Sequence, residues 1–113
     1  MNLVTKFKNA FNGLKSGLKQ PAIQLQVFLA LVAIVTFLIL KISYYEWLVV
    51  LVMIALVCLC EWINSIFEAT VDYISLKEHP TAKLIKDLGA GMVLLAAFFA
   101  FLCGVIIIIN NLR

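Results

Sequence analysis

The sequence predicts an all-α membrane protein, with an N-terminal amphipathic surface helix followed by three transmembrane helices. Two observations support this fold class. The 113 residues are 65% hydrophobic and only 13% charged, which is more apolar surface than a soluble domain of this size can bury. The apolar residues also gather in three runs that are each, with their flanks, long enough to cross a bilayer. A single domain, residues 1–113, is expected.

The first predicted element is an amphipathic helix at about residues 3–19. Its apolar side chains recur at helical spacing among lysines, and share one face: Leu3, Phe7, Phe11, Leu14 and Leu18. This pattern is typical of a helix lying on an anionic membrane surface, although an ordinary surface helix can show it too. The apolar residues are too scattered for the core of a signal peptide. The Gln20-Pro21 pair marks the break before the next helix.

Three membrane spans are expected at about 23–41, 47–72 and 84–110. The first contains the run VFLALVAIVTFLIL, and the second begins with WLVVLVMIALVCLC and continues as a helix beyond the membrane. The third contains 22 residues without charge, from 88 to 109. The stretch 41–46, KISYYE, is predicted as a short polar turn, and 74–81 as the next connection.

Lysine counts predict the orientation in the membrane. Four lysines precede residue 20 and three lie within 72–87, against one lysine in the 41–46 turn. The positive-inside rule therefore places the N-terminus and the 72–87 loop in the cytoplasm and the C-terminus outside. The expected location is the cytoplasmic (inner) membrane.

An acidic stripe is the first chemical signal. Glu61, Asn64, Glu68 and Asp72 lie at offsets 0, 3, 7 and 11, which places them on one narrow face of a helix. Glu61 directly follows fourteen apolar residues. An ionisable side chain at that depth is costly and must face protein or a water-filled cavity, so it is a candidate functional residue.

A second polar cluster opens the third span. His79, Lys83, Lys86 and Asp87 fall on one side of a helix, and a short connection must bring them to the acidic stripe at the cytoplasmic face. Carboxylates for a divalent metal and lysines for phosphate oxygens are what phosphoryl transfer requires. The same residues could instead be solvated helix ends or structural salt bridges. A glycine-rich nucleotide loop is absent, so a nucleotide would need side chains and a metal.

Two motifs resemble the small prokaryotic diacylglycerol kinase and undecaprenol kinase family. They are 61-EWINSIFEATVD-72 and 79-HPTAKLIKDLGAGMVLLAA-97, and the resemblance extends over nearly the whole chain. It implies a homotrimer with active sites between subunits at the cytoplasmic membrane interface. It also implies direct transfer of the γ-phosphate of MgATP to a lipid hydroxyl, in phospholipid metabolism. The expected partners are a membrane lipid, ATP, the bilayer and other copies of the chain, without nucleic acid.

The resemblance also implies roles for individual residues. Glu61 would be the catalytic base, Asn64 would orient the site, and Glu68 would hold Mg²⁺ on the ATP phosphates. Further ATP contacts would come from Glu78, His79, Lys86 and Asp87. The family has another Glu, a second metal ligand, near the end of the surface helix. This chain has no acidic residue before Glu46, and Gln20 most nearly occupies that position, to within about one residue. Gln20 is therefore the second candidate metal ligand, with one charge fewer.

Two alternatives to an active kinase remain open. One is a catalytically impaired paralogue that keeps the assembly but lacks one metal-binding Glu. The other is a small non-enzymatic membrane protein for transport or assembly, with salt-bridged helix ends. A transporter would place polar groups near the bilayer midplane, whereas here they gather at one end. Either diacylglycerol or undecaprenol fits the apolar spans, with Ala90-Gly91 slightly favouring the undecaprenol branch of the resemblance.

Overall fold

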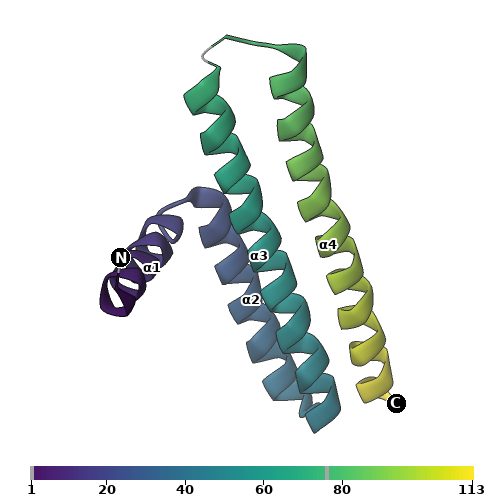
Figure 1. Ribbon diagram of the computed structural model, residues 1–113. Helices are drawn as coiled ribbons and strands as arrows, with labels where there is room; N and C mark the ends of the chain where they lie inside the picture. The colour runs from purple at the N-terminus through teal and green to yellow at the C-terminus, as the bar shows by residue number, and fades with distance from the viewer. Residues whose placement is uncertain (1, 76) are drawn as a thin grey trace.

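The computed structural model describes residues 2–75 and 77–113, which form four α-helices (Figure 1). They are α1 (Leu3–Gly17), α2 (Pro21–Leu40), α3 (Tyr44–Ile74) and α4 (Pro80–Leu112). The described residues contain no strand. The helices α2, α3 and α4 are long and apolar enough to span a membrane. The predicted fold class, an amphipathic helix followed by three spans, is thereby confirmed.

Consecutive long helices run in opposite directions, because each connection between them is short. α3 and α4 pack side by side along most of their length, and α2 packs mainly against α3. The α2–α3 turn and the C-terminus lie at one end of the bundle, and the α3–α4 connection lies at the other (Figure 1). α3 and α4 continue well beyond the corner between α1 and α2, so the polar ends of both helices project past the start of α2.

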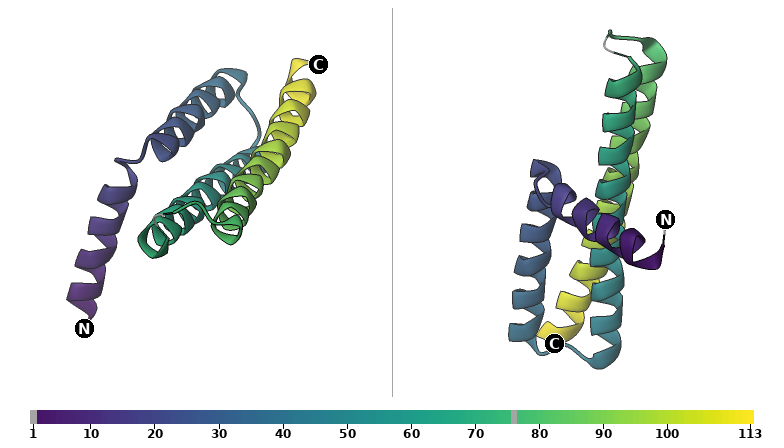
Figure 2. Two further views of the ribbon diagram at one scale, coloured as in Figure 1. Left: turned by 90° about the horizontal axis from the view of Figure 1, so that it is seen from above. Right: turned by 60° about the vertical axis from the view of Figure 1, so that its left-hand side comes forward.

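The surface helix α1 leaves the bundle at a steep angle to α2 (Figure 2). Its N-cap is Asn2, whose side-chain oxygen accepts a hydrogen bond from the backbone N–H of Thr5 at 2.9 Å. The apolar face of α1 remains between 50 and 68% exposed, at Leu3, Phe7, Phe11, Leu14 and Leu18. A row of large apolar side chains left open in this way fits a helix that buries them in the membrane interface.

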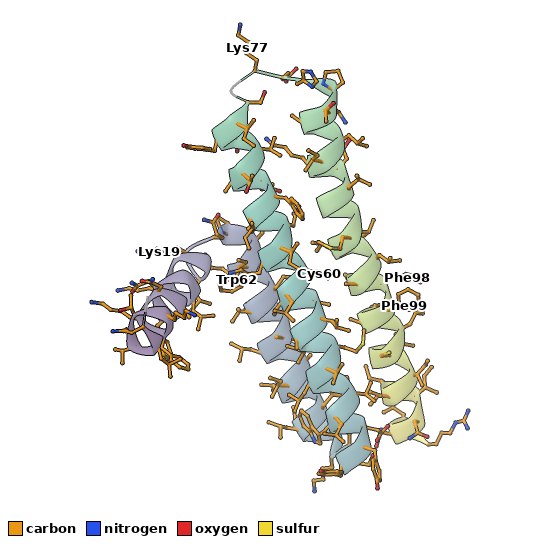
Figure 3. The ribbon with its side chains drawn as sticks, viewed as in Figure 1. Lys19, Cys60, Trp62, Lys77, Phe98 and Phe99 are labelled. Carbon is orange, nitrogen blue, oxygen red and sulfur yellow. The ribbon has the colours of Figure 1, made fainter. Side chains whose placement is uncertain are left out.

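One close contact ties α1 to α3. Gly17 is buried, and a Cβ atom at this position would lie 1.9 Å from Cζ2 of Trp62 and 2.3 Å from Cη2. The indole ring of Trp62 therefore occupies the space that any larger residue at position 17 would need. Figure 3 shows Trp62 beside the corner between α1 and α2. The contact fixes where the surface helix meets the bundle.

Capping residues place two helix starts earlier than the hydropathy pattern suggests. α3 begins at Tyr44, within the predicted polar turn, because Ser43 and Glu46 form a capping box with hydrogen bonds of 3.3 and 3.0 Å. α4 begins at Pro80, with His79 as N-cap and proline at the first helical position. Between α2 and α3, Lys41 adopts the left-handed conformation, with φ 55° and ψ 53°.

The core of the single chain is small and lies near the α2–α3 turn. Phe37, Ile42, Val50 and Ile107 are buried there, and most other large apolar side chains remain exposed. This distribution suits a chain whose outer surface faces lipid or other copies.

A polar clamp holds the same end of the bundle together. Glu46 accepts hydrogen bonds from the amides of Asn110 and Asn111, at 3.0 to 3.2 Å. The clamp ties the end of α4 to the start of α3.

Candidate active site

The acidic stripe on α3 changes from buried to exposed along the helix. Glu61 and Asn64 are 7% and 6% exposed, whereas Glu68 and Asp72 are exposed. Glu61 contacts α2 through Gln26 and Asn64 contacts α4 at Gly89, whereas Glu68 and Asp72 lie nearer the end of α3 at the α3–α4 connection. The stripe therefore joins a protein-enclosed region to a region open to solvent.

Glu61 is the most enclosed acid of the stripe. Its Oε2 accepts a hydrogen bond from Nε2 of Gln26 on α2, at 3.4 Å. Gln26 also lines an apolar cavity of about 310 Å³ between α2, α3 and α4, together with Val57 and Cys58, which lie one turn before Glu61. The carboxylate therefore stands at the end of an apolar space, where a charge needs a polar partner.

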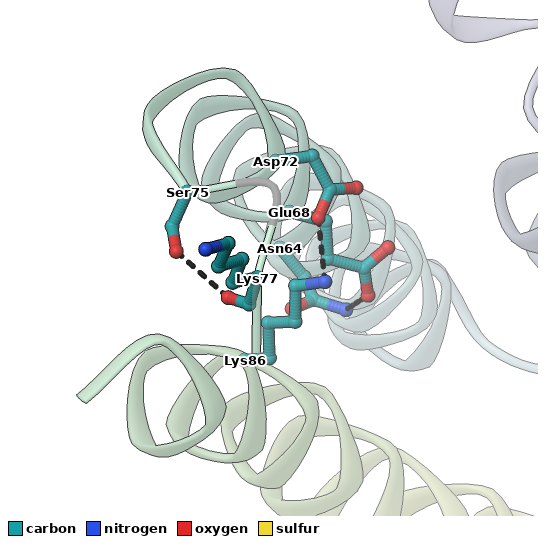
Figure 4. Close-up of polar contacts among 6 residues, drawn as sticks. All are labelled: Asn64, Glu68, Asp72, Ser75, Lys77 and Lys86. Atoms are coloured by element: carbon teal, nitrogen blue, oxygen red, sulfur yellow. Dashed lines mark hydrogen bonds and ion pairs between the residues drawn. The ribbon is translucent and has the colours of Figure 1, made fainter. Parts of the chain in front are cut away.

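Asn64 links this buried region to Glu68. Its Nδ2 donates a hydrogen bond to Oε1 of Glu68 at 3.2 Å (Figure 4). Its Oδ1 is buried and has no hydrogen-bond partner within the described part of the chain. An unpaired buried amide oxygen typically costs about 1–3 kcal/mol, so this arrangement is not favoured by stability alone.

The two polar clusters meet through an ion pair between helices. Nζ of Lys86 on α4 lies 2.6 Å from Oδ1 of Asp72 on α3 (Figure 4). Lys83 pairs with Asp87 one turn along α4, also at 2.6 Å. All four side chains are at least 42% exposed, so these pairs contribute little stability and can exchange partners readily. The prediction that the two clusters meet is confirmed through Lys86 and Asp72.

A polar pocket of about 660 Å³ opens between the end of α3 and the start of α4. Its charged and polar lining residues are Asp72, Ser75, Lys77, Glu78, His79, Lys83, Lys86 and Asp87. The pocket thus collects four of the residues predicted to contact ATP. The lining carries three lysines and three acids, and its lysines could contact the phosphate oxygens of a nucleotide once Lys83 and Lys86 release their carboxylate partners.

The remaining predicted residues occupy distinct places. His79 is the N-cap of α4, and its Nδ1 accepts a hydrogen bond from the backbone N–H of Thr81 at 3.1 Å. Gln20 is the N-cap residue of α2, is exposed, and makes no capping hydrogen bond with its side chain. Its amide is therefore free of that role at the corner between α1 and α2.

The site has few side chains that could ligate a metal ion. The described residues contain no group of three or more His, Cys, Asp or Glu side chains that could hold a metal. Mg²⁺ is commonly bound through one or two carboxylates together with substrate phosphates, and it keeps several waters. Glu68 is exposed at the edge of the stripe and could supply one such carboxylate. The residues present thus fit a Mg²⁺ ion that arrives with a nucleotide, rather than one held in a preformed protein cage.

Sequence reasoning missed two neighbours of the stripe. Gln26 is a polar residue on the face of α2 that carries the buried Ile23 and Phe37. A polar side chain on a buried face needs a polar partner, and Glu61 is that partner. Gly89, which is buried directly against Asn64, has no side chain to mark it as part of a polar site. Neither partner can be identified without knowing which helix faces overlap.

Comparison with known proteins gives two similarities. The model of the family described as prokaryotic diacylglycerol kinase matches residues 8–108. An undecaprenol kinase of Bacillus subtilis (strain 168) is 35% identical over 72 residues, which is 64% of this chain. The match spans 58% of the length of that relative. The family match includes the whole acidic stripe, the polar pocket and the corner between α1 and α2.

Proposed function

Because the chain belongs to the prokaryotic diacylglycerol kinase family, we propose that it is an ATP-dependent lipid kinase. It transfers the γ-phosphate of MgATP directly to the hydroxyl of a membrane lipid, either diacylglycerol or undecaprenol. The similarity to an undecaprenol kinase supports a polyprenol as one acceptor to test. The working form is a homotrimer in the cytoplasmic membrane, with the N-terminus and the α3–α4 connection in the cytoplasm.

One observation supports this function above the others: along α3, the buried Glu61 lies between the residues that line the apolar cavity, Val57 and Cys58, and those that line the polar pocket, Val71 and Asp72. A lipid acceptor has its tail in hydrocarbon and its hydroxyl at the interface, whereas a nucleotide approaches from water. Glu61 lies where these two substrates would meet. It serves as the general base that accepts the proton of the lipid hydroxyl, and the Gln26 amide orients its carboxylate.

The polar pocket binds the nucleotide. Lys86 exchanges Asp72 for phosphate oxygens, and His79, Glu78 and Asp87 form further contacts around the nucleotide. Glu68 would hold a metal that arrives with the nucleotide, with Gln20 as a neutral second ligand, and Asn64 orients Glu68 through their hydrogen bond. When bound, Mg²⁺ would neutralise charge on the phosphates during transfer.

A catalytically impaired paralogue is the second candidate, and one residue favours it. The corner between α1 and α2 carries the neutral Gln20 where the family resemblance calls for an acid. A site with one carboxylate fewer binds a divalent cation more weakly. Such a protein would keep the membrane fold and nucleotide pocket but turn over slowly.

The test is ADP release by the purified protein in lipid mesophase, supplied with MgATP and either diacylglycerol or undecaprenol. Lipid-dependent ADP formation supports the kinase and identifies its acceptor. Glu68→Gln should abolish Mg²⁺-dependent turnover, and Glu61→Gln should slow the chemical step with ATP binding retained. Thr70→Ala, which changes an exposed residue on the same part of α3 whose hydroxyl bonds the Ile66 carbonyl within the helix, serves as the control. ADP formation unaffected by both site variants would contradict the assigned roles, and no turnover from folded protein would favour the impaired paralogue.

A further inference from the structure

Gly89 faces the side chain of Asn64 across the α3–α4 interface. A Cβ atom at Gly89 would lie 2.2 Å from Oδ1 of Asn64 and 3.2 Å from its Cγ. Real Cβ atoms essentially never approach a neighbour as closely as 2.2 Å, so the Asn64 side chain occupies the space that a side chain at position 89 would take. Two residues further along α4, Gly91 is exposed, and a Cβ there would have nothing within 4 Å. The two glycines therefore provide a test variant and a matched control for the same substitution by alanine.

Glu68 determines which way the Asn64 amide points, and Gly89 leaves room for the amide oxygen on the other side. The amide oxygen lies against Gly89, where Cα–H groups are weak donors, and the NH₂ group donates to Glu68 at 3.2 Å. The reversed amide would place its oxygen against the Glu68 carboxylate, where two acceptors repel. The orphaned oxygen is therefore the consequence of aiming the amide donor at Glu68.

We infer that Gly89 is a positioning residue of the site, which acts through Asn64 on Glu68. The missing side chain provides a slot for the Asn64 amide. The slot holds the amide donor on one carboxylate oxygen of Glu68, which leaves the other oxygen free for the metal–nucleotide complex. The catalytic part of this inference rests on the proposed function, whereas the structural coupling of Gly89 to Asn64 does not.

A double-mutant cycle on thermal stability tests the structural coupling without any assay of activity. Gly89→Ala is compared in the parent chain and in an Asn64→Ala background, with Gly91→Ala as the matched control. In the parent chain, Gly89→Ala should lower the unfolding midpoint by about 5 °C. In the Asn64→Ala background the same change should cost little, because the atoms that the new methyl group meets are gone. Equal losses in both backgrounds, or an equal loss for Gly91→Ala, would overturn the inference.

The positioning role is tested by the Mg²⁺ dependence of ADP release. Gly89→Ala should raise the Mg²⁺ concentration for half-maximal turnover about tenfold, as loss of an outer-shell partner of a metal ligand commonly does. Gly91→Ala should stay within about twofold of the parent. A stability coupling with an unchanged Mg²⁺ requirement would refute the positioning role. Failure of the proposed function is seen separately, as absence of lipid-dependent turnover in the parent protein, and leaves the stability cycle interpretable.

Discussion

Replacing Gly17 by alanine should separate the surface helix from the bundle. The new Cβ would lie 1.9 Å from the ring of Trp62, whereas a carbon–carbon contact needs about 3.5 Å. Helix and ring must therefore move apart by about 1.5 Å. Overpacking of this kind costs about 1–3 kcal/mol, and the cost cannot exceed the free energy that holds α1 against α3. Gly13→Ala on the same helix is the control, because nothing lies within 4 Å of its position.

The two alanine variants should change the stability of the protein in opposite directions. Gly13→Ala should stabilise α1 by up to about 1 kcal/mol through helix propensity, whereas Gly17→Ala should destabilise its docking. The chain has two tryptophans, so a Trp47→Phe background leaves Trp62 as the only reporter. In that background, Gly17→Ala should shift Trp62 emission to longer wavelength and increase its quenching by acrylamide. Identical emission and unfolding midpoints for the two variants would refute the close Gly17–Trp62 contact.

Three further predictions follow from the helix ends. Gln20→Glu should lower the Mg²⁺ concentration for half-maximal ADP release, by about tenfold if the side chain ligates the metal; no change would place position 20 outside the metal site. Lys41→Gly should raise stability by about 1 kcal/mol in thermal unfolding, because it relieves a left-handed conformation, and Lys41→Ala should not match this gain. Asn111→Ala should lower the unfolding midpoint more than Asn110→Ala, because Asn111 donates to both Glu46 oxygens and to the Ile107 carbonyl; the reverse order would contradict the clamp geometry.

The membrane-helix layout could be predicted from the sequence because hydropathy over some twenty residues is a local property. The surface helix could also be predicted, since one face repeats Leu and Phe at helical spacing. The helix starts at Tyr44 and Pro80 were harder to predict from the sequence. Each start depends on a side-chain cap, formed by Ser43 with Glu46 in one case and by His79 in the other. The pattern of apolar residues does not indicate these hydrogen bonds.

The acidic stripe of the candidate site follows from helical periodicity, but its environment does not. Periodicity places Glu61 and Glu68 on one face, and the apolar run before Glu61 predicts that it faces protein or a water-filled cavity, but neither signal identifies the neighbours that bury it. Gln26 comes from α2 and Gly89 from α4, and both contacts depend on how the helices are rotated and offset against one another. Such offsets are set by packing of the whole chain.

The positions of Glu46 and Glu61 on α3 have a consequence for the host bilayer. Fifteen residues of helix separate them, so they stand about 22 Å apart along the axis. The hydrocarbon core of a typical bilayer is about 30 Å thick. A bilayer of that thickness with one boundary at Glu46 would place Glu61 several ångströms inside the other boundary, where its burial and its hydrogen bond from Gln26 shield the carboxylate from lipid. A thinner bilayer would bring the membrane interface closer to Glu61, so the acyl-chain length of the host lipids should alter the activity proposed for this residue.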